Sequence, residues 1–261
     1  NEPAEIPLSM KQGAIILIIE DNADMRAYIR SYLGSLYIVH EAKDGVEGVK
    51  KAKEVIPDLI ICDVMMPRMD GYEVAKILKE EEKTSHIPIV MLTAKAGQDS
   101  KLEGLEKGAD EYITKPFDAK ELLVRTKNLI EGRRKLRERF SASRVLKPGE
   151  IEVQSLDDVF LQKVKSAVEA RMSDEEFSVE DLARDVSMSR SQLHRKLVAL
   201  TNQSPSDLIR YMRLHRAKEL LEKRAGTVSE IAFMVGFNTV AYFSKCFHDQ
   251  FGVVPSEARK S

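Results

Sequence analysis

The 261-residue sequence predicts two domains of different fold class: an α/β domain built on a five-stranded parallel sheet, and a domain composed only of helices. Three observations predict this division. Short apolar stretches alternate with helical stretches up to about residue 131, helical periodicity alone follows residue 155, and the net charge changes sign between the halves. With 43% apolar and 32% charged residues, the chain can form a packed core in each domain.

Five short stretches of the first half are predicted to be strands. Three of them are apolar almost throughout, as expected of parallel strands that are covered on both faces. Helical stretches separate them, and this alternation predicts a doubly wound sheet with helices on both sides. The expected strands are 14–20, 37–42, 58–63, 87–94 and 111–114, and the expected helices are 23–33, 45–55, 71–82, 98–107 and 118–131.

The second half is predicted to be helical throughout. A basic and polar segment precedes it and is interrupted by Pro148 and Gly149, so we interpret this segment as a linker that is helical at its start. The expected divisions are an N-terminal tail 1–12, an α/β domain 13–131, a linker 132–154 and a helical domain 155–261. The helices expected in the last domain are 156–172, 179–186, 189–200, 205–223, 228–235 and 239–250.

The helical domain contains an internal repeat. The stretch "VEDLARDVSMSRSQLHRKL" (179–197) is similar to "VSEIAFMVGFNTVAYFSKCF" (228–247). Each copy has a small alanine, which lets two helices approach closely, and then a tight turn at Ser187 or Gly236. Two short helices joined by such a turn are typical of a helix-turn-helix unit, so the domain is predicted to contain two of them.

The net charge of −1 hides an asymmetry. Residues 1–132 carry −6, residues 133–261 carry +5, and residues 190–261 alone carry +6. An acidic first half suits cations and a basic end suits nucleic acid. The two cysteines, Cys62 and Cys246, lie in different halves without further metal ligands at zinc spacing, so we expect a reducing, cytosolic setting.

No apolar stretch reaches the roughly 20 residues that a membrane-spanning helix needs, and no signal peptide is visible. The sequence begins with Asn rather than Met, as a piece of a longer protein would.

Polar residues follow the predicted strands at the points where four of them end. Since the carboxyl ends of parallel strands meet at one edge of a sheet, these side chains are expected to lie close together. Taken singly, a strand-end aspartate is usually a turn residue or a helix cap, but their joint occurrence in chain order favours a site. The residues are Glu20 and Asp21, Asp63, Thr93, which Ala94 follows, and Lys115, which Pro116 follows.

The residue types in this set suit phosphoryl chemistry. Crowded carboxylates repel each other, and Mg²⁺ relieves that repulsion while still accepting phosphate oxygens. The carboxylate of Asp63 beside such an ion is a suitable nucleophile toward a phosphoryl group. Lys115 and Thr93 would contact the phosphoryl oxygens by charge and by a hydrogen bond.

Four stretches of the first half, "IIEDNADMRAYI", "LIICDVMMPRMDGYE", "IPIVMLTAKA" and "GADEYITKPF", together resemble the response-regulator receiver domain. The resemblance covers about residues 13–131 and implies a flavodoxin-like fold. It implies that Asp63 is the phosphoacceptor and that a histidine kinase is the donor. It also implies that Mg²⁺ is bound by Glu20, Asp21, Asp63 and the backbone carbonyl of Met65, that Thr93, Ala94 and Lys115 serve the phosphoryl group, and that Tyr112 moves inward with Thr93.

The two predicted recognition helices place apolar residues on one face and polar residues on the other, as a helix in a DNA groove does. Any amphipathic helix sorts its residues in this way, so the pattern is compatible with an ordinary surface too. The helix between the two units, of about 20 residues, would be ~30 Å long, close to one turn of DNA. Its Arg210, Arg213, Arg216 and Lys218 would add positive charge for phosphates.

Residues 156–260, and above all "TVSEIAFMVGFNTVAYFSKCFHDQFGVVPSEAR", resemble the AraC-type DNA-binding domain. The resemblance implies that double-stranded DNA is a partner. The positions that match the family's base readers, with their neighbours, are Arg190, Ser191, His194 and Arg195 in the first unit, and Asn238, Val240, Ala241, Ser244 and Lys245 in the second.

The pairing of the two domains resembles the C-terminal end of Bacteroides-type hybrid two-component sensors, which carry a sugar-sensing region, a kinase, a receiver and this output on one membrane-anchored chain. We therefore expect a cytoplasmic, phosphorylation-dependent transcription regulator that is not itself an enzyme, that pairs through its receiver surface around 95–131, and that regulates carbohydrate use. A free-standing response regulator of the same domain pair is an alternative.

Two rival functions follow from the same residues. The first is an Asp-nucleophile phosphohydrolase, but such enzymes commonly place a second aspartate two residues after the nucleophile, and Met65 stands there. The second is a receiver whose helical domain binds a protein; salt-sensitive binding to duplex DNA would count against it.

Overall fold

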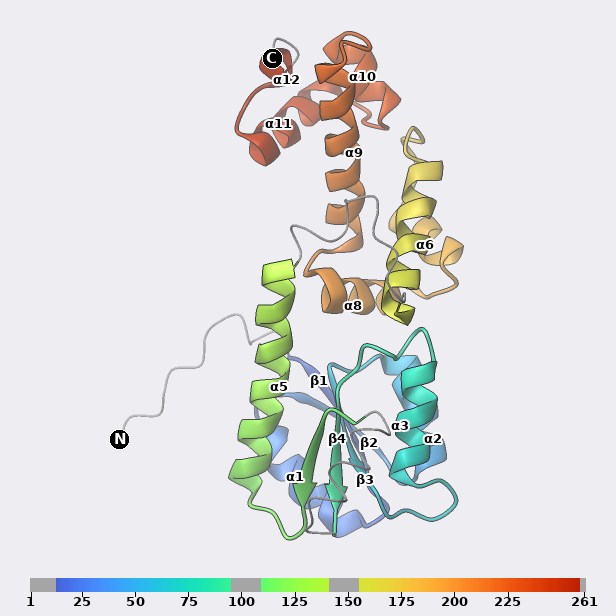
Figure 1. Ribbon diagram of the computed structural model, residues 1–261, viewed down its shortest axis with the longest axis vertical. Helices are drawn as coiled ribbons and strands as arrows, with labels where there is room; N and C mark the ends of the chain where they lie inside the picture. The colour runs from blue at the N-terminus through green and yellow to red at the C-terminus, as the bar shows by residue number, and fades with distance from the viewer. Residues whose placement is uncertain (1–12, 95–108, 141–154, 259–261) are drawn as a thin grey trace, which may run out of the picture. The chain divides into compact units, whose positions relative to one another are not determined.

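The structure, a computed structural model, describes residues 13–94, 109–140 and 155–258, with no side-chain placement for 133–140 (Figure 1). It divides into two compact units, Asn1–Glu150 and Ile151–Ser261, which are described separately. The predicted helix 98–107 and the residues 141–154 of the predicted linker lie outside the described residues.

The first unit is built on a parallel sheet with the strand order β2-β1-β3-β4-β5. The predicted five-stranded parallel sheet is therefore confirmed. Because the order reverses between β1 and β3, the carboxyl ends of these two strands flank the position where ligands bind in sheets of this type. The strands are β1 (Ile15–Ile19), β2 (Ile38–Ala42), β3 (Leu59–Asp63), β4 (Ile89–Thr93) and β5 (Glu111–Thr114).

Two apolar layers enclose the sheet. Every residue of β1, β3 and β4 is buried. Since successive side chains of a strand point to opposite faces, both faces of the sheet are covered. One layer, which includes Leu17 and Ile60, packs against α2 (Gly45–Val55) and α3 (Gly71–Glu80). The other, which includes Ile16 and Ile61, packs against α1 (Ala23–Leu33) and α5 (Ala119–Phe140).

Helix α5 continues past residue 131 to Phe140. The start of the predicted linker is therefore helical, as the sequence pattern indicates. Residues 132–140 contain four Arg together with Lys, Glu and Leu, all of them strong helix formers, so their intrinsic preference explains the continuation.

The second unit is helical in every element that the structure describes. Its helices are α6 (Leu156–Ala170), α7 (Val179–Asp185), α8 (Arg190–Thr201), α9 (Pro205–Glu222), α10 (Val228–Met234), α11 (Val240–Phe251) and a short α12 (Pro255–Ala258) that the sequence pattern did not predict. Reciprocal capping boxes start α6, α7, α8 and α10, which explains why these helices begin where they do.

The two predicted helix-turn-helix units are α7–α8 and α10–α11. In both, the first helix buries its small alanine, Ala183 or Ala232. In both, the turn contains a residue with left-handed backbone, Ser187 at φ 56° and Gly236 at φ 80°. Helix α9 connects the units and packs against α8, α10 and α11.

Among the residues that the structure describes, no helix combines the length and the apolarity needed to cross a bilayer.

Candidate functional site

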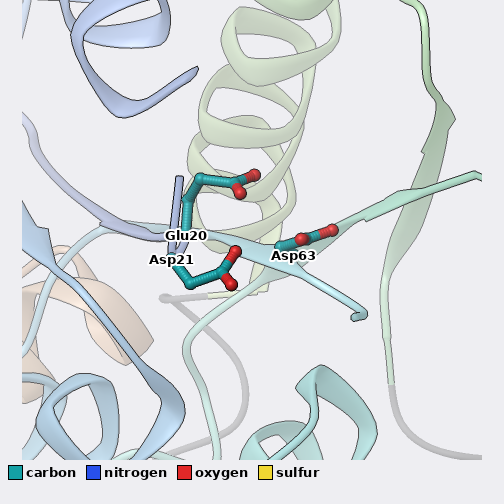
Figure 2. A group of neighbouring side chains, drawn as sticks. All are labelled: Glu20, Asp21 and Asp63. Atoms are coloured by element: carbon teal, nitrogen blue, oxygen red, sulfur yellow. The ribbon is translucent and has the colours of Figure 1, made fainter. Parts of the chain in front are cut away.

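Three carboxylates meet at the carboxyl edge of the sheet (Figure 2). Glu20 and Asp21 follow β1 directly, and Asp63 is the last residue of β3. One oxygen from each lies within 4.8 Å of the others. Glu20 and Asp63 are buried, at 1% and 6% exposure, and Asp21 is exposed. The sequence placed these acids on neighbouring strand ends, and the structure brings them together.

Lys115, which follows β5, reaches the same position. Its Nζ lies 2.7 Å from Oε2 of Glu20 and 2.9 Å from Oδ1 of Asp63. The peptide bond between Lys115 and Pro116 is cis. The two distances show that one ammonium bridges both buried carboxylates.

The electrostatics of the cluster reflect its burial. Loss of hydration raises the pKa of Glu20, and the nearby charge of Asp63 raises it further, against the lowering effect of Lys115. Burial by itself would lower the pKa of Lys115, but its hydrogen bonds to Glu20 and Asp63 outweigh that effect and raise the pKa. The lysine thus remains a cation between two desolvated acids, and Asp21 adds a third acid at the rim.

The acidic pair is held by a residue that we did not predict. Arg26 in α1 donates through Nη1 to the carbonyls of Glu20, at 2.7 Å, and of Asp21, at 3.0 Å. The Asn22 side chain between them caps α1 by accepting from the Met25 backbone N–H. The sequence offered only one signal for this role, a basic residue five or six positions after the acids. Such a spacing is too common to predict the contact by itself.

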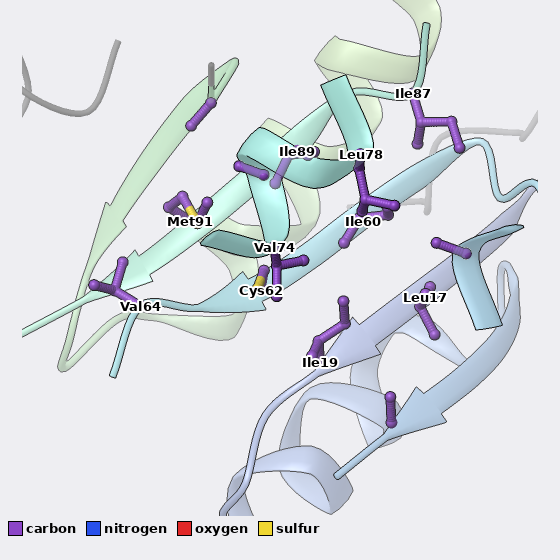
Figure 3. Packing of buried hydrophobic residues seen from close by; sticks show 14 of the residues in the cluster. Leu17, Ile19, Ile60, Cys62, Val64, Val74, Leu78, Ile87, Ile89 and Met91 are labelled. Carbon is purple, nitrogen blue, oxygen red and sulfur yellow. The ribbon is translucent and has the colours of Figure 1, made fainter. Parts of the chain in front are cut away.

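Asp63 is held in place by the apolar layer around its neighbours and by the start of α3. Its neighbours Cys62 and Val64 belong to the same apolar layer as Val74 of α3 (Figure 3). The backbone N–H of Gly71 donates to the carbonyl of Val64 at 3.0 Å, and a Cβ at Gly71 would lie 2.3 Å from the carbonyl oxygen of Asp63. A glycine is needed here because the start of α3 touches the backbone of Asp63.

The structure also describes the other residues that were predicted to serve the phosphoryl group. Thr93 is buried at the end of β4, next to the end of β3, and Ala94 after it is exposed. Tyr112 of β5 is 5% exposed and packs in the apolar layer, so its ring already points inward, and its hydroxyl has no hydrogen-bond partner among the described residues. The Met65 side chain is 70% exposed in the loop after β3.

The donor set suits a hard divalent cation. Three carboxylates supply oxygen ligands, and Mg²⁺ in proteins takes one or two such ligands while retaining waters. Asp21 at the rim leaves the cluster open to solvent on one side. The residues present therefore fit a magnesium ion that can also accept a phosphate oxygen.

In the first helix-turn-helix unit, the predicted base readers lie on the outer face of α8. Ser191, His194 and Arg190 are exposed and Arg195 is half-buried, whereas Leu193 and Leu197 are buried. Arg190 also makes an ion pair of 2.6 Å with Glu180 of α7.

In the second unit, the predicted readers precede or lie on α11. Asn238, Ala241 and Lys245 are exposed, and Val240 and Ser244 are half-buried, opposite the buried Phe243 and Phe247. Tyr242 on the same face is 52% exposed and forms a hydrogen bond with Arg210 of α9. The sequence pattern did not single it out, because an aromatic residue directly before Phe243 looks like part of the core.

The basic residues of α9, which are expected to add positive charge for phosphates, also make ion pairs or hydrogen bonds within the unit. Arg210 pairs with Asp207, Arg216 pairs with Glu219, and Lys218 lies 3.8 Å from Glu222. Arg213 is half-buried and donates to a backbone carbonyl within the unit. One guanidinium nitrogen of Arg213 is thus used inside the fold, which leaves this residue less available for DNA phosphates than the sequence suggested.

Two protein families match the chain, one in each unit. The response regulator receiver domain matches residues 16–127, and the helix-turn-helix domain matches residues 182–261. Together these matches agree with the fold of both units.

Similar proteins include kinases and regulators. Histidine kinase P4 from Formosa agariphila is 42% identical over 250 residues, 96% of this chain and 18% of that protein. The phosphate regulon transcriptional regulatory protein PhoB from Pseudomonas aeruginosa is 46% identical over 123 residues, 45% of this chain and 52% of that protein. The chain thus spans about a fifth of the first relative and about half of the second.

Solved structures match the first unit. The receiver domain of a sensor histidine kinase from Pseudomonas aeruginosa, determined with a magnesium ion in its active site cleft, is 33% identical. The match covers 46% of this chain and 98% of that domain, with a TM-score of 0.43.

Proposed function

Since the chain joins a response regulator receiver domain to an AraC-type helix-turn-helix domain, we propose that it regulates transcription and that phosphorylation of Asp63 controls its binding to DNA. This domain pair fits a regulator rather than an enzyme. Its partners are a histidine kinase, which the receiver domain implies, and DNA, which the helix-turn-helix domain implies. The observation that carries the assignment of Asp63 is the cluster of three carboxylates within 4.8 Å, two of them bridged by Lys115.

The proposed reaction is the transfer of a phosphoryl group to Asp63. A carboxylate oxygen of Asp63 attacks the phosphorus of a phosphohistidine, the P–N bond breaks, and the imidazole leaves as an acyl phosphate forms. Magnesium, held by Glu20, Asp21, Asp63 and the carbonyl of Met65, would neutralise charge on the phosphoryl oxygens. Lys115 is already at the acceptor oxygen and would bind a phosphoryl oxygen, while Glu20 keeps it oriented.

The proposed switch uses residues at the next strand ends. The Thr93 hydroxyl would donate to the phosphoryl group, and Tyr112, whose ring is buried among apolar residues, would be held inward by that shift. The surface from residue 95 to 131 would then pair two receivers, although residues 95–108 lie outside the described part of the chain. Pairing would raise the effective concentration of the second DNA-binding domain at a repeated site.

The proposed DNA contacts come from the exposed faces of α8 and α11. Ser191, His194 and Arg195 would read one major groove, with Arg190 beside them. In the second unit Asn238, Ser244 and Lys245 would form hydrogen bonds, while Val240 and Ala241 offer apolar contact to thymine methyl groups.

We further infer that the chain is the output portion of a hybrid sensor that also contains the kinase. The similarity to Histidine kinase P4 supports this, since it extends over both domains. Because chromosomal DNA is in the cytoplasm, binding to it would place this portion there, with an inner-membrane anchor elsewhere in the longer protein. Regulation of carbohydrate use is proposed from the likeness to Bacteroides-type hybrid sensors; a free-standing regulator is the alternative.

Phosphorylation is tested with acetyl phosphate and Mg²⁺ followed by intact-protein mass spectrometry. The wild type should gain the mass of one phosphoryl group, Asp63→Asn should not, and Asp24→Asn, an acid of α1 outside the cluster, should behave as the wild type. If the wild type gains no mass while a known receiver is phosphorylated under the same conditions, the assignment of Asp63 is wrong. Steady release of phosphate from a phosphate ester would instead support the phosphohydrolase function.

DNA binding is tested by mapping the genomic sites bound by the wild type and by Asp63→Ala. Fewer or weaker sites are expected for the variant. Arg195→Ala and Lys245→Ala should weaken binding to a mapped site; unchanged affinity in both would show that the recognition helices are wrongly assigned.

A further inference from the structure

Three segments of the helical unit meet at the side chain of Arg213 in α9. Its Nη2 donates to the carbonyl of Asp174, at 2.5 Å, in the turn between α6 and α7. Gly236 lies in the turn between α10 and α11, and a Cβ there would lie 2.8 Å from Cζ of Arg213 and 2.5 Å from the carbonyl oxygen of Met172. The turn of the second helix-turn-helix unit therefore packs directly on the guanidinium and on the α6–α7 turn.

The α6–α7 turn is in turn joined to the first helix-turn-helix unit. Arg171 lies 3.0 Å from Asp174 in the turn, and 3.9 Å and 3.8 Å from Asp181 and Asp185 of α7. Its guanidinium also lies over the ring of Phe177, 4.7 Å from the centroid. Each exposed ion pair is weak alone, but several that share one arginine restrict the turn together. A continuous set of contacts thus runs from α7 through Asp174 and Arg213 to Gly236.

The guanidinium of Arg213 is enclosed, and the turn beside it admits only glycine. Its Nε is buried without a hydrogen-bond partner among the described residues, and burial lowers the pKa of the guanidinium. Gly236 has φ 80°, which a residue with a Cβ adopts only with strain, so both its conformation and its contacts require glycine. The planar fork of an arginine fills this position in a way that the flexible chain of a lysine does not.

We propose that Arg213, seated against Gly236, fixes the distance and angle between the two recognition helices and thereby the spacing of the two DNA boxes that the chain accepts. The inference rests on the proposed DNA binding. Helix α9 has 18 residues, about 27 Å at ~1.5 Å per residue, which is near the ~34 Å of one DNA turn. The helix alone sets an approximate distance, and the junction at Arg213 restricts the second unit from rotating about it.

Without this junction each unit keeps its own caps and apolar core, so binding to a single box should persist. The second box would then be engaged at a lower effective concentration and over a wider range of spacings. Spacing preference is therefore the property that distinguishes a positioning role from a general loss of stability or charge.

The test uses the full 261-residue chain. A two-box duplex is first selected from a random library by the wild type, and derivatives are made with one box scrambled or with the spacing changed by about one or two base pairs. Arg213→Gln is compared with Arg216→Gln, which removes the same charge from an exposed position of the same helix. On the two-box duplex, Arg213→Gln should bind at least ~10-fold more weakly, with one-box binding unchanged and spacing preference reduced. Arg216→Gln should keep the spacing preference.

Arg213→Lys, which retains the charge but not the fork, should lose the spacing preference as well, and it decides the matter if circular dichroism shows that Arg213→Gln does not fold. An Arg213 variant that folds and keeps the wild-type spacing preference overturns the proposal, as does an equal loss of affinity for one-box and two-box duplexes in such a variant. If the wild type selects no duplex at all, the proposed DNA binding fails instead, which is a separate result.

Discussion

The Nζ of Lys115 lies 2.9 Å from Oδ1 of Asp63, although Asp63 ends β3 and Lys115 follows β5, with β4 between these two strands. The same Nζ lies 2.7 Å from Glu20, so a single cation offsets two buried carboxylates. A magnesium ion bound at these carboxylates would serve the same electrostatic need as the lysine, so removing one should increase the effect of the other.

Replacing Lys115 with Met should destabilise the first unit. Two buried carboxylates would face each other without the ammonium, and the loss of its charged hydrogen bonds should cost about 1.5–3 kcal/mol at neutral pH. Mg²⁺ should then raise the melting temperature of Lys115→Met more than that of the wild type, because ion binding to the folded state relieves a larger repulsion. Thermal unfolding with and without Mg²⁺ measures both effects.

The control for this variant is Lys50→Met, which removes an exposed lysine whose contact with Glu54 spans 4.0 Å. It should show the wild-type response to Mg²⁺. An equal response in Lys115→Met would mean that the lysine and the ion do not share the cluster.

Replacing Gly71 with Ala should disturb Asp63 through its backbone. The new Cβ would be placed 2.3 Å from the Asp63 carbonyl oxygen, which cannot move without shifting the acceptor. Overpacking of this kind costs about 1–3 kcal/mol, and Mg²⁺ affinity measured by calorimetry should fall with it. Gly132→Ala in α5 is the matched control, since its Cβ would meet nothing within 4 Å. Wild-type Mg²⁺ affinity in Gly71→Ala would show that the α3 start does not position the acceptor.

The sequence predicted the sheet and its acidic edge because both follow from local signals. Uniformly apolar strands indicate a buried parallel sheet, and strand ends place Glu20, Asp63 and Lys115 at one edge. The roles of Arg26 and Arg213 were not predictable, since each depends on a backbone carbonyl that tertiary packing brings near. A charge on a helix looks the same in sequence whether it faces DNA or a turn of its own fold.

A buried ion pair in the second unit should respond unequally to removal of its partners. Lys196 of α8 is fully buried, with its Nζ 2.9 Å from Asp157 of α6 and 4.8 Å from the centre of the Phe160 ring. Asp157→Ala leaves the buried ammonium without this carboxylate and should cost about 3–5 kcal/mol, whereas Lys196→Met places an apolar chain in the same space and should cost less. Urea unfolding of both variants gives the comparison.

The double variant Asp157→Ala with Lys196→Met should recover most of the stability that Asp157→Ala loses, because the buried ammonium is then absent. Strictly additive losses would show that the two side chains stabilise the α6–α8 contact independently.

Protonation of His215 should make the helical unit less stable as the pH falls below the ordinary pKa of histidine. Its ring centroid lies 4.1 Å from that of Tyr211 and 5.1 Å from that of Phe251, between α9 and α11. Burial, and then the charge of Lys218, lower the pKa of His215 below its usual 6.5. As the pH falls through 6.5, the unfolded chain takes up the proton first, so the free energy of unfolding decreases until the folded state is also protonated.

His215→Phe keeps an aromatic ring in this position but removes the titration. Between about pH 7.5 and 5.5 its melting temperature should therefore fall less than that of the wild type. His194→Phe, at an exposed position of α8, should retain the wild-type dependence. An equal loss of stability in His215→Phe and in the wild type over this range would mean that other groups cause the acid sensitivity. Protonation of the His215 ring, which is held between Tyr211 and Phe251, would then have no measurable cost.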